Sequence, residues 1–272
     1  MPHSIILNFV PQSGIPKGYL TGKHVHGLFL TLVNAVDPDL AAHLHAQKVN
    51  KGFTLSPVQS RKYLPRQPLQ WEHPHGIPAG KPCWWRVSLL DDQLFGRLTQ
   101  LWLHLNPEKP WHLGPANLLI TSMLATGQKA MPWAHYQSYE EIFTQASDEN
   151  RFVDLMFYTP TTFRQGDYDS ALPNPETVFR SLWQRWQQFS GIPFPEELPR
   201  YVFPCGFDLR SYTVMDDRSK LIGCVGAISY KILGTDDPFV IKCINSLADF
   251  ALYAGVGRKT PMGMGMTRRI QL

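Results

Sequence analysis

The sequence predicts an α+β fold of two tandem ferredoxin-like (RRM-like) domains, because the order strand–helix–strand–strand–helix–strand occurs twice along the chain. In the first half, apolar residues recur with a helical period over residues 25–36, and strand-like runs flank them. In the second half, proline-bounded helical patterns cover residues 175–189 and 238–254 among four strand-like runs. We therefore place the domains at residues 1–125 and 126–272.

The first domain begins with a strand over residues 4–10, followed by a strongly amphipathic helix. The apolar positions of that helix are i, i+3, i+4, i+7, i+8 and i+11, namely Val25, Leu28, Phe29, Leu32, Val33 and Val36. The other elements are expected over residues 39–47 (a helix after Pro38), 53–59 and 83–90 (strands), 94–104 (helix) and 111–121, which ends as a strand.

The second domain repeats this order with clearer helix ends. Its elements are expected over residues 152–158 (strand), 175–189 (helix), 200–214 and 221–232 (strands), 238–254 (helix) and 262–270 (strand). Asp236 and Asp237 precede the last helix, and Gly255 follows it as a stop signal.

Composition places the chain among globular proteins with a local basic surface. Hydrophobic residues make up 43% of the 272 residues and charged residues 18%. Residues 1–125 carry 11 Lys and Arg against 6 Asp and Glu, whereas residues 126–272 carry 15 against 16. The four cysteines are widely spaced, which indicates reduced thiols. Without a signal peptide or a run of membrane-spanning length, we expect a cytoplasmic protein that does not contact membranes.

The C-terminal tail, AGVGRKTPMGMGMTRRIQL, carries the clearest functional signal. Two Gly-x-Gly pairs flank Arg258 and Lys259, two further arginines follow, and the last 18 residues contain no acid. Glycine allows close approach of the backbone, and the cations favour a polyanion such as RNA or DNA. The glycines follow a helix and precede a strand, so neither nucleotide-binding motif fits. The alternative is a glycine-rich turn that caps the last helix.

Two His-x-His pairs, His24/His26 and His43/His45, raise the possibility of a metal site. Residues two apart on a helix do not share a face, so we expect no metal and no cofactor. His45 points away from the inner face of its helix and lies in the last turn, where the helix dipole favours a positive charge. Lys48 and Lys51 are close to it in sequence.

An accessible histidine beside lysines is what RNA cleavage without metal requires. Imidazole can take the proton of a ribose 2′-hydroxyl or give one to the leaving 5′-oxygen, and a cation can offset charge on the phosphate. The alternative for His45 is an ordinary solvated histidine in a basic patch.

Of the adjacent Trp84 and Trp85, only one can face the core. The other stacks a base or, as we favour, fills the domain interface.

Four segments resemble blocks of one family, in the same order along the chain. They are HGLFLTLVNAVDPDLAAHLHAQKVNKGFTLSPV, YTPTTFR, LIGCVGAISYKI and the tail GVGRKTPMGMG. Each is similar to a segment of the CRISPR-associated repeat-processing endoribonucleases, the Cas-six family of the RAMP superfamily. The resemblance covers most of the chain.

The resemblance implies tandem ferredoxin-like domains and metal-independent cutting of CRISPR repeat RNA, with 2′,3′-cyclic phosphate and 5′-hydroxyl ends. The family's motif histidine falls on His45 and its following lysine on Lys51. The family's glycine-rich loop matches Gly255, Gly257, Gly263 and Gly265, which are expected to pack near the RNA. From the basic pattern of the tail, we expect Arg258, Lys259, Arg268 and Arg269 to hold the RNA backbone. Some members carry a catalytic tyrosine or second histidine on the preceding helix; this helix has no tyrosine, so His24, His26 or His43 would have to replace it.

The sequence therefore predicts an endoribonuclease with CRISPR repeat RNA, folded as a stem-loop, as its substrate. The main alternative is a non-catalytic RNA-binding subunit of a CRISPR effector complex, since family members without a full site bind RNA and do not cut it. Other CRISPR effector subunits are candidate partners in either case, and the protein is expected to be a monomer or a homodimer. A metal-dependent enzyme and a small-molecule phosphate-binding protein are the remaining alternatives.

Overall fold

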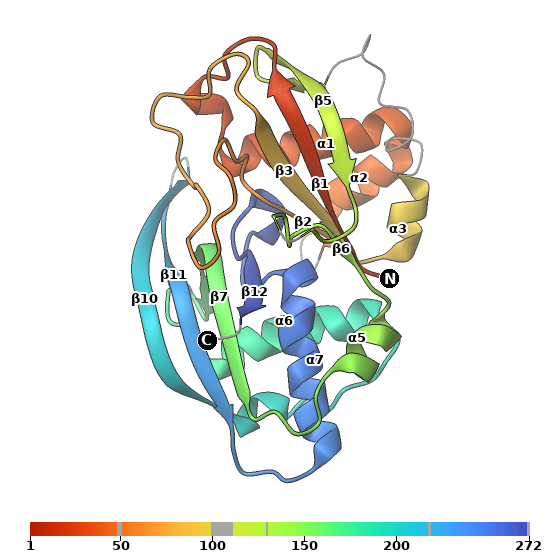
Figure 1. Ribbon diagram of the computed structural model, residues 1–272, viewed down its shortest axis with the longest axis vertical. Helices are drawn as coiled ribbons and strands as arrows, with labels where there is room; N and C mark the ends of the chain where they lie inside the picture. Colours follow the sequence, from red (N-terminus) through yellow and green to blue (C-terminus); the bar gives the residue numbers. More distant parts are fainter. Residues whose placement is uncertain (48–50, 99–110, 129, 217–218, 271–272) are drawn as a thin grey trace.

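The computed structural model describes residues 1–47, 51–98, 111–128, 130–216 and 219–270 (Figure 1). Two antiparallel sheets dominate it, one from each half of the chain, and they are the sheets of two ferredoxin-like domains. The division after residue 125 stays a prediction.

The first sheet has the order β2-β3-β1-β5-β4, and all its neighbouring strands are antiparallel. Its strands are β1 (His3–Pro11), β2 (Phe53–Leu55), β3 (Cys83–Leu89), β4 (Trp111–Leu113) and β5 (Ala116–Leu124), and β6 (His135–Tyr136) pairs with the start of β1. The segment 111–121 ends as a strand, as predicted, and it begins with a second strand, because Gly114 turns the chain into a hairpin at a φ of 61°.

The helices of this half within the described residues are α1 (Gly22–Val36), α2 (Pro38–Ala46) and α3 (Asp92–Arg97). The apolar stripe of α1 is buried as predicted, apart from the half-buried Val36. α2 begins where the Asp37 carboxylate accepts a hydrogen bond of 2.9 Å from the Leu40 amide, and Pro38 occupies the first helical position. The predicted helix over residues 94–104 ends at Arg97; residues 99–104 lie outside the described residues.

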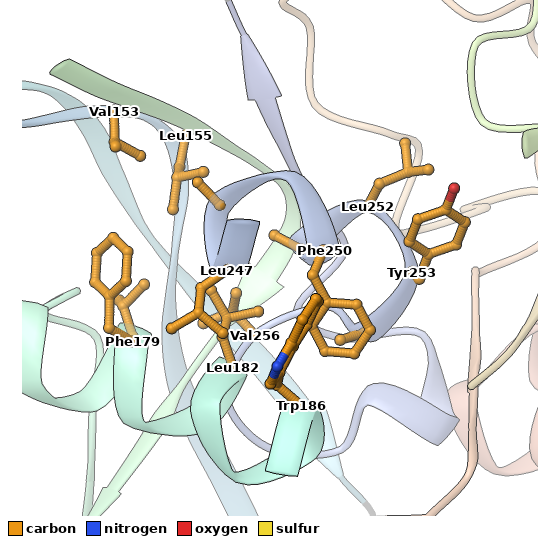
Figure 2. Packing of buried hydrophobic residues seen from close by; sticks show 14 of the residues in the cluster. Val153, Leu155, Phe179, Leu182, Trp186, Leu247, Phe250, Leu252, Tyr253 and Val256 are labelled. Atoms are coloured by element: carbon orange, nitrogen blue, oxygen red, sulfur yellow. The ribbon is translucent and has the colours of Figure 1, made fainter. Parts of the chain in front are cut away.

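The second sheet has the order β10-β11-β7-β12. Its strands are β7 (Phe152–Thr161), β10 (Val202–Asp216), β11 (Ser219–Ile232) and β12 (Thr267–Ile270). Two helices, α6 (Pro175–Phe189) and α7 (Pro238–Ala254), pack on it with the bounds that the sequence predicts. Trp186 of α6 and Phe250 of α7 meet edge to face at 5.4 Å between ring centres, and Figure 2 shows both within this core.

The second half also contains elements that the sequence analysis missed. They are α5 (Tyr139–Gln145), the hairpin of β8 (Phe163–Gln165) and β9 (Tyr168–Ser170), and 3-10 turns at Leu198–Tyr201 and Thr260–Met262; a third such turn, Lys17–Tyr19, precedes α1. The strand predicted over residues 262–270 starts only at Thr267, because Gly263 and Gly265 have φ of 88° and 70°. Among the described residues, no helix is both long and apolar enough to cross a membrane.

The two halves share buried surface. Trp85, 1% exposed, lies in the core of the first sheet, whereas its neighbour Trp84, 5% exposed, packs in a core with residues of the second half. Trp84 therefore fills the interface between the halves, the option that the sequence analysis favoured over base stacking.

Candidate active site

The candidate site lies where the end of α2, the start of β2 and the first turns of α1 meet the glycine-rich loop that follows α7. His45 is exposed in the last turn of α2, while Leu40 and Leu44 of the same helix are buried. The side chain of His45 is thus on the solvent side of the helix, as the sequence predicts.

Lys51 is half-buried and links the last turn of α2 to the segment just before β2. Its ammonium group donates hydrogen bonds to the carbonyl oxygens of Leu44 and, at 3.5 Å, His45, and it lies 5.9 Å from the centre of the Phe53 ring. Burial lowers the pKa of Lys51. These bonds hold a cation next to the backbone of His45.

His26 of α1 is the histidine that joins this group. Its ring stacks on Phe53 at 5.7 Å, and its Nδ1 lies 3.1 Å from the carbonyl oxygen of Pro261 in the glycine-rich loop. A carbonyl oxygen only accepts, so Nδ1 carries the proton and the neutral ring keeps a lone pair on Nε2.

The environment of His26 keeps this ring neutral. Burial lowers its pKa most, the bond to Pro261 opposes the shift, and electrostatic interactions with Lys51 and His45 lower the pKa further. His26, His45 and Lys51 are therefore electrostatically coupled.

The two other histidines considered from the sequence lie apart from this group. His24 Nδ1 is 2.8 Å from the Thr21 hydroxyl, and the ring packs edge-on against Tyr19 at 5.1 Å. His43 is exposed in the last turn of α2 and forms none of the contacts that join His26 to this group. Of the three candidate partners for His45, His26 has the geometry of a base.

The glycines of the loop are required by its own packing. Gly255, Gly257, Gly263 and Gly265 all have positive φ. A Cβ at Gly265 would lie 2.0 Å from the Val256 carbonyl oxygen, and one at Gly257 would lie 2.4 Å from that of Thr162. A Cβ at Gly263 would approach the Pro57 nitrogen to 2.9 Å. The glycines thus let the loop pack against itself and against the segments after β2 and β7, which explains them without a ligand.

The basic residues of the tail have different surroundings in the structure. Arg258 forms an ion pair with Asp169 of β9. Lys259, with a left-handed φ of 54°, lines a cavity beside the start of α1. Arg268 and Arg269 line a different cavity, of about 910 Å³, at β12. Lys259 therefore lines a different cavity from Arg268 and Arg269.

Arg269 is held by three acceptors. Its guanidinium donates to Asn245 Oδ1 at 2.6 Å, to Asp249 Oδ1 at 3.2 Å and to the carbonyl oxygen of Phe152 at 3.2 Å. This set of bonds ties β12 to α7 and to the start of β7, so the structure gives Arg269 a structural role.

Arg268 faces a histidine–tyrosine pair that the sequence analysis did not identify. His135 Nδ1 and the Tyr253 hydroxyl are 2.5 Å apart in the wall of the same cavity. Burial lowers the pKa of His135, and the charge of Arg268 lowers it further. No sequence pattern could have found this pair, because its members are 118 residues apart and each is single in its segment.

The chain folds as tandem ferredoxin-like domains with a glycine-rich loop after the last helix. A structure described as a RAMP protein that binds different RNA substrates shares this fold, with a TM-score of 0.60 and 16% identity over 99% of this chain and all of that one. The chain belongs to the CRISPR-associated endoribonuclease Cas6 family. The family model of the CRISPR Cas6 N-terminal domain matches residues 1–144, and that of CRISPR-associated endoribonuclease Cas6 matches residues 155–267.

Individual relatives agree with this assignment. CRISPR-associated endoribonuclease Cas6 of Mycobacterium tuberculosis is 24% identical over 261 residues, which cover 91% of this chain and 71% of the relative. The Streptococcus thermophilus protein of the same name is 29% identical over 134 residues, which cover 46% of this chain and 53% of the relative. The product complex of a Thermus thermophilus Cas6 has a TM-score of 0.80 at 27% identity, and the match covers 99% of this chain and 100% of that one.

Proposed function

We propose that this chain is a metal-independent endoribonuclease that cuts CRISPR precursor RNA within its repeats and leaves 2′,3′-cyclic phosphate and 5′-hydroxyl ends. The family, with relatives named as endoribonucleases and a similar structure described as a product complex, supports the reaction class. The observation that carries the proposal is the convergence of His26, His45 and Lys51 beside the glycine-rich loop.

In the proposed reaction His26 is the general base and His45 the general acid. Nε2 of His26 takes the proton of the ribose 2′-hydroxyl, and the 2′-oxygen attacks the adjacent phosphorus atom. The bond from phosphorus to the 5′-oxygen breaks, and His45 gives that oxygen its proton. The cyclic phosphate and the 5′-hydroxyl are then the products, and two imidazoles account for both proton transfers.

Lys51 offsets the negative charge that grows on the phosphate oxygens during this attack. Its ammonium carries three protons and is positioned by the carbonyl oxygens at the end of α2. Arg268 holds the RNA backbone in the β12 cavity, Arg258 and Lys259 hold it from the loop, and the glycines Gly255, Gly257, Gly263 and Gly265 give the loop the shape to present them. Arg269 contributes by keeping β12 in place.

The decisive experiment uses the purified chain, an end-labelled repeat RNA and EDTA. A single cut whose upstream product ends in a cyclic phosphate supports the proposal. Cleavage that EDTA abolishes would instead indicate a metal-dependent enzyme, and binding without a cut would indicate an RNA-binding subunit.

His45→Ala should abolish cleavage and leave RNA binding within about twofold, because the exposed ring supplies a proton and little binding surface. A His43→Ala variant is the matched control, since His43 is also exposed on α2 and lies outside the proposed group. Unchanged cleavage by His45→Ala would reject its catalytic role.

A further inference from the structure

A second cavity, of about 360 Å³, lies between the start of α1, the glycine-rich loop and the tip of the β10–β11 hairpin. The loop contributes Lys259, Met262 and Met264 to its wall, and α1 contributes Gly22 and Lys23. The cavity is thus built from the loop and the helix that carry the candidate active site, yet the proposed chemistry does not use it.

Its inner wall is apolar and partly aromatic. Val214, Leu221 and Met264 form a small buried cluster that is separate from the two main cores, and Trp71 packs against it. A half-buried tryptophan next to methionines offers a flat, polarisable surface, which is what a nucleobase stacks on. The volume is at the small end of the range for ligand cavities and suits one base with part of its sugar.

The rim of the cavity is basic. Lys17 and Lys23 are exposed on one side, and Lys259 is half-buried on the other. One acid, Glu72, also lines the cavity and accepts a hydrogen bond from the Tyr212 hydroxyl. Three ammonium groups around an apolar hollow match a nucleotide whose base is inserted and whose phosphates stay at the mouth.

The cavity is also close to the proposed catalytic group. Gly22 in its wall and His26 are four residues apart on α1, which is a rise of about 6 Å along the helix. On the loop, Met262 of the wall directly follows Pro261, whose carbonyl oxygen binds His26. A stacked strand rises ~3.4 Å per nucleotide along its axis, so a separation of about 6 Å puts a base in the cavity and a phosphate at His26 within about two nucleotides.

We propose that this cavity binds one extruded base of the RNA, from a nucleotide within about two positions of the cut, and that it thereby selects the cleavage site. The inference rests on the proposed function for the identity of the RNA. Trp71 stacks on the base, while Lys17, Lys23 and Lys259 contact the flanking phosphates.

The test measures binding of repeat RNA made uncleavable by a 2′-deoxyribose at the cut. Single abasic nucleotides replace, one at a time, the three residues on either side of that position. With the wild-type chain, one abasic position should weaken binding about tenfold, since a stacked base is lost there. With Trp71→Leu this penalty should disappear, and with Trp71→Phe it should remain.

Two further variants keep the test decisive. Met215→Trp places a bulky ring at the mouth from a side chain that is 70% exposed, so it should fold normally and also remove the abasic penalty. Phe239→Leu, an exposed aromatic residue at the start of α7, should retain the full penalty. An abasic penalty that is the same in wild type, Trp71→Leu and Met215→Trp overturns the proposal, as does the lack of any penalty.

Failure of the base cavity is distinguishable from failure of the proposed endoribonuclease. Cleavage of the unmodified RNA in EDTA tests the enzyme alone. The abasic series tests the cavity by binding alone, so either result can be negative while the other is positive.

Discussion

At the scale of single residues, the two histidines of the site differ in environment although both lie on surface helices. His45 is exposed, whereas His26 is half-buried between Phe53 and the Pro261 carbonyl. Burial and the charge of Lys51 both favour the neutral imidazole of His26. A base must be neutral to act, so this environment suits a base.

The pH dependence of cleavage tests this assignment. The rate should fall as pH drops through the lowered pKa of His26, below the ordinary 6.5, because protonation removes the base. Lys51→Met removes a cation that lowers this pKa, so the acid limb of the profile should move to higher pH while the maximal rate falls. Single-turnover rates at a series of pH values measure both effects.

Lys242→Met is the control for that series. Lys242 lies 5.5 Å from the Phe143 ring, much as Lys51 lies over Phe53, but it is on α7 and away from the site. Its profile should coincide with that of the wild type. An acid limb that stays in place in Lys51→Met would show that His26 is not the group that titrates.

Arg268 and Arg269 are neighbours in sequence with different expected roles. Arg268→Ala should weaken RNA binding and reduce the salt slope by about one phosphate contact. Arg269→Ala should lower the free energy of unfolding by about 1–3 kcal/mol instead, because Asn245 and Asp249 lose their partner. Salt titrations of RNA binding and urea unfolding of both variants separate the two roles; an unchanged slope in Arg268→Ala would exclude its phosphate contact.

At the scale of elements, the glycines of the loop have two properties that can be separated by mutation. One is the close packing that a Cβ would disturb, and the other is the positive φ. Gly265→Ala should disrupt the loop and slow cleavage, because the new Cβ would lie 2.0 Å from the Val256 carbonyl oxygen. Gly80→Ala is the matched control: its φ of 76° is similar to the 70° of Gly265, but nothing lies within 4 Å of the added Cβ.

Gly80→Ala should cost only the backbone strain, about 1 kcal/mol, and leave cleavage intact. Thermal unfolding and cleavage rates of the two variants provide the comparison. Equal behaviour of the two glycines would mean that the close packing of the loop is unimportant.

Helix and strand bounds were predicted correctly where the sequence contains strong capping or periodicity signals. α6 and α7 have the predicted bounds because Asn174-Pro175 and Asp237-Pro238 combine a capping side chain with proline at the first helical position. α5 was missed although Ser138 and Glu141 form a capping box, a pattern that is readable in the sequence. The β8–β9 hairpin was missed for a different reason, because strands of three residues are too short to show alternation.

At the scale of the whole molecule, the site is made by contacts that no local pattern encodes. His26 and Pro261 are 235 residues apart in sequence. The sequence placed His45 on the exposed face of its helix, because that face follows from the apolar period of α2. The sequence does not identify the proposed catalytic partner of His45, because the partner depends on which of the three histidines the glycine-rich loop of the other domain contacts.

One buried cation fixes how the two domains meet at that loop. Arg86 of β3 donates hydrogen bonds to the Ser4 and Thr54 hydroxyls within its own sheet and to the carbonyl oxygens of Leu252 and Tyr253. Those carbonyls end α7, whose last turn has no basic residue of its own. Burial lowers the pKa of Arg86 to about 9, which still leaves it charged at pH 7. A cation of the first domain thus complements the helix dipole of the second, directly before the loop begins.

Arg86→Met should therefore reduce both stability and cleavage. The variant removes the guanidinium donor from the Leu252 carbonyl oxygen and from the Ser4 and Thr54 hydroxyls, while the Tyr253 carbonyl oxygen still accepts from the Thr54 hydroxyl. We expect a loss of about 3 kcal/mol in the free energy of unfolding. Arg180→Met is the control: Arg180 forms ion pairs with Glu176 and Glu196, but its side chain is 43% exposed, so its loss should cost less than about 1 kcal/mol. Urea unfolding measures both values, and Arg86→Lys should recover only part of the loss, because one ammonium cannot reach all four oxygens. If Arg86→Met unfolded like Arg180→Met and cleaved RNA at the wild-type rate, the position of the loop would not depend on this contact between the domains.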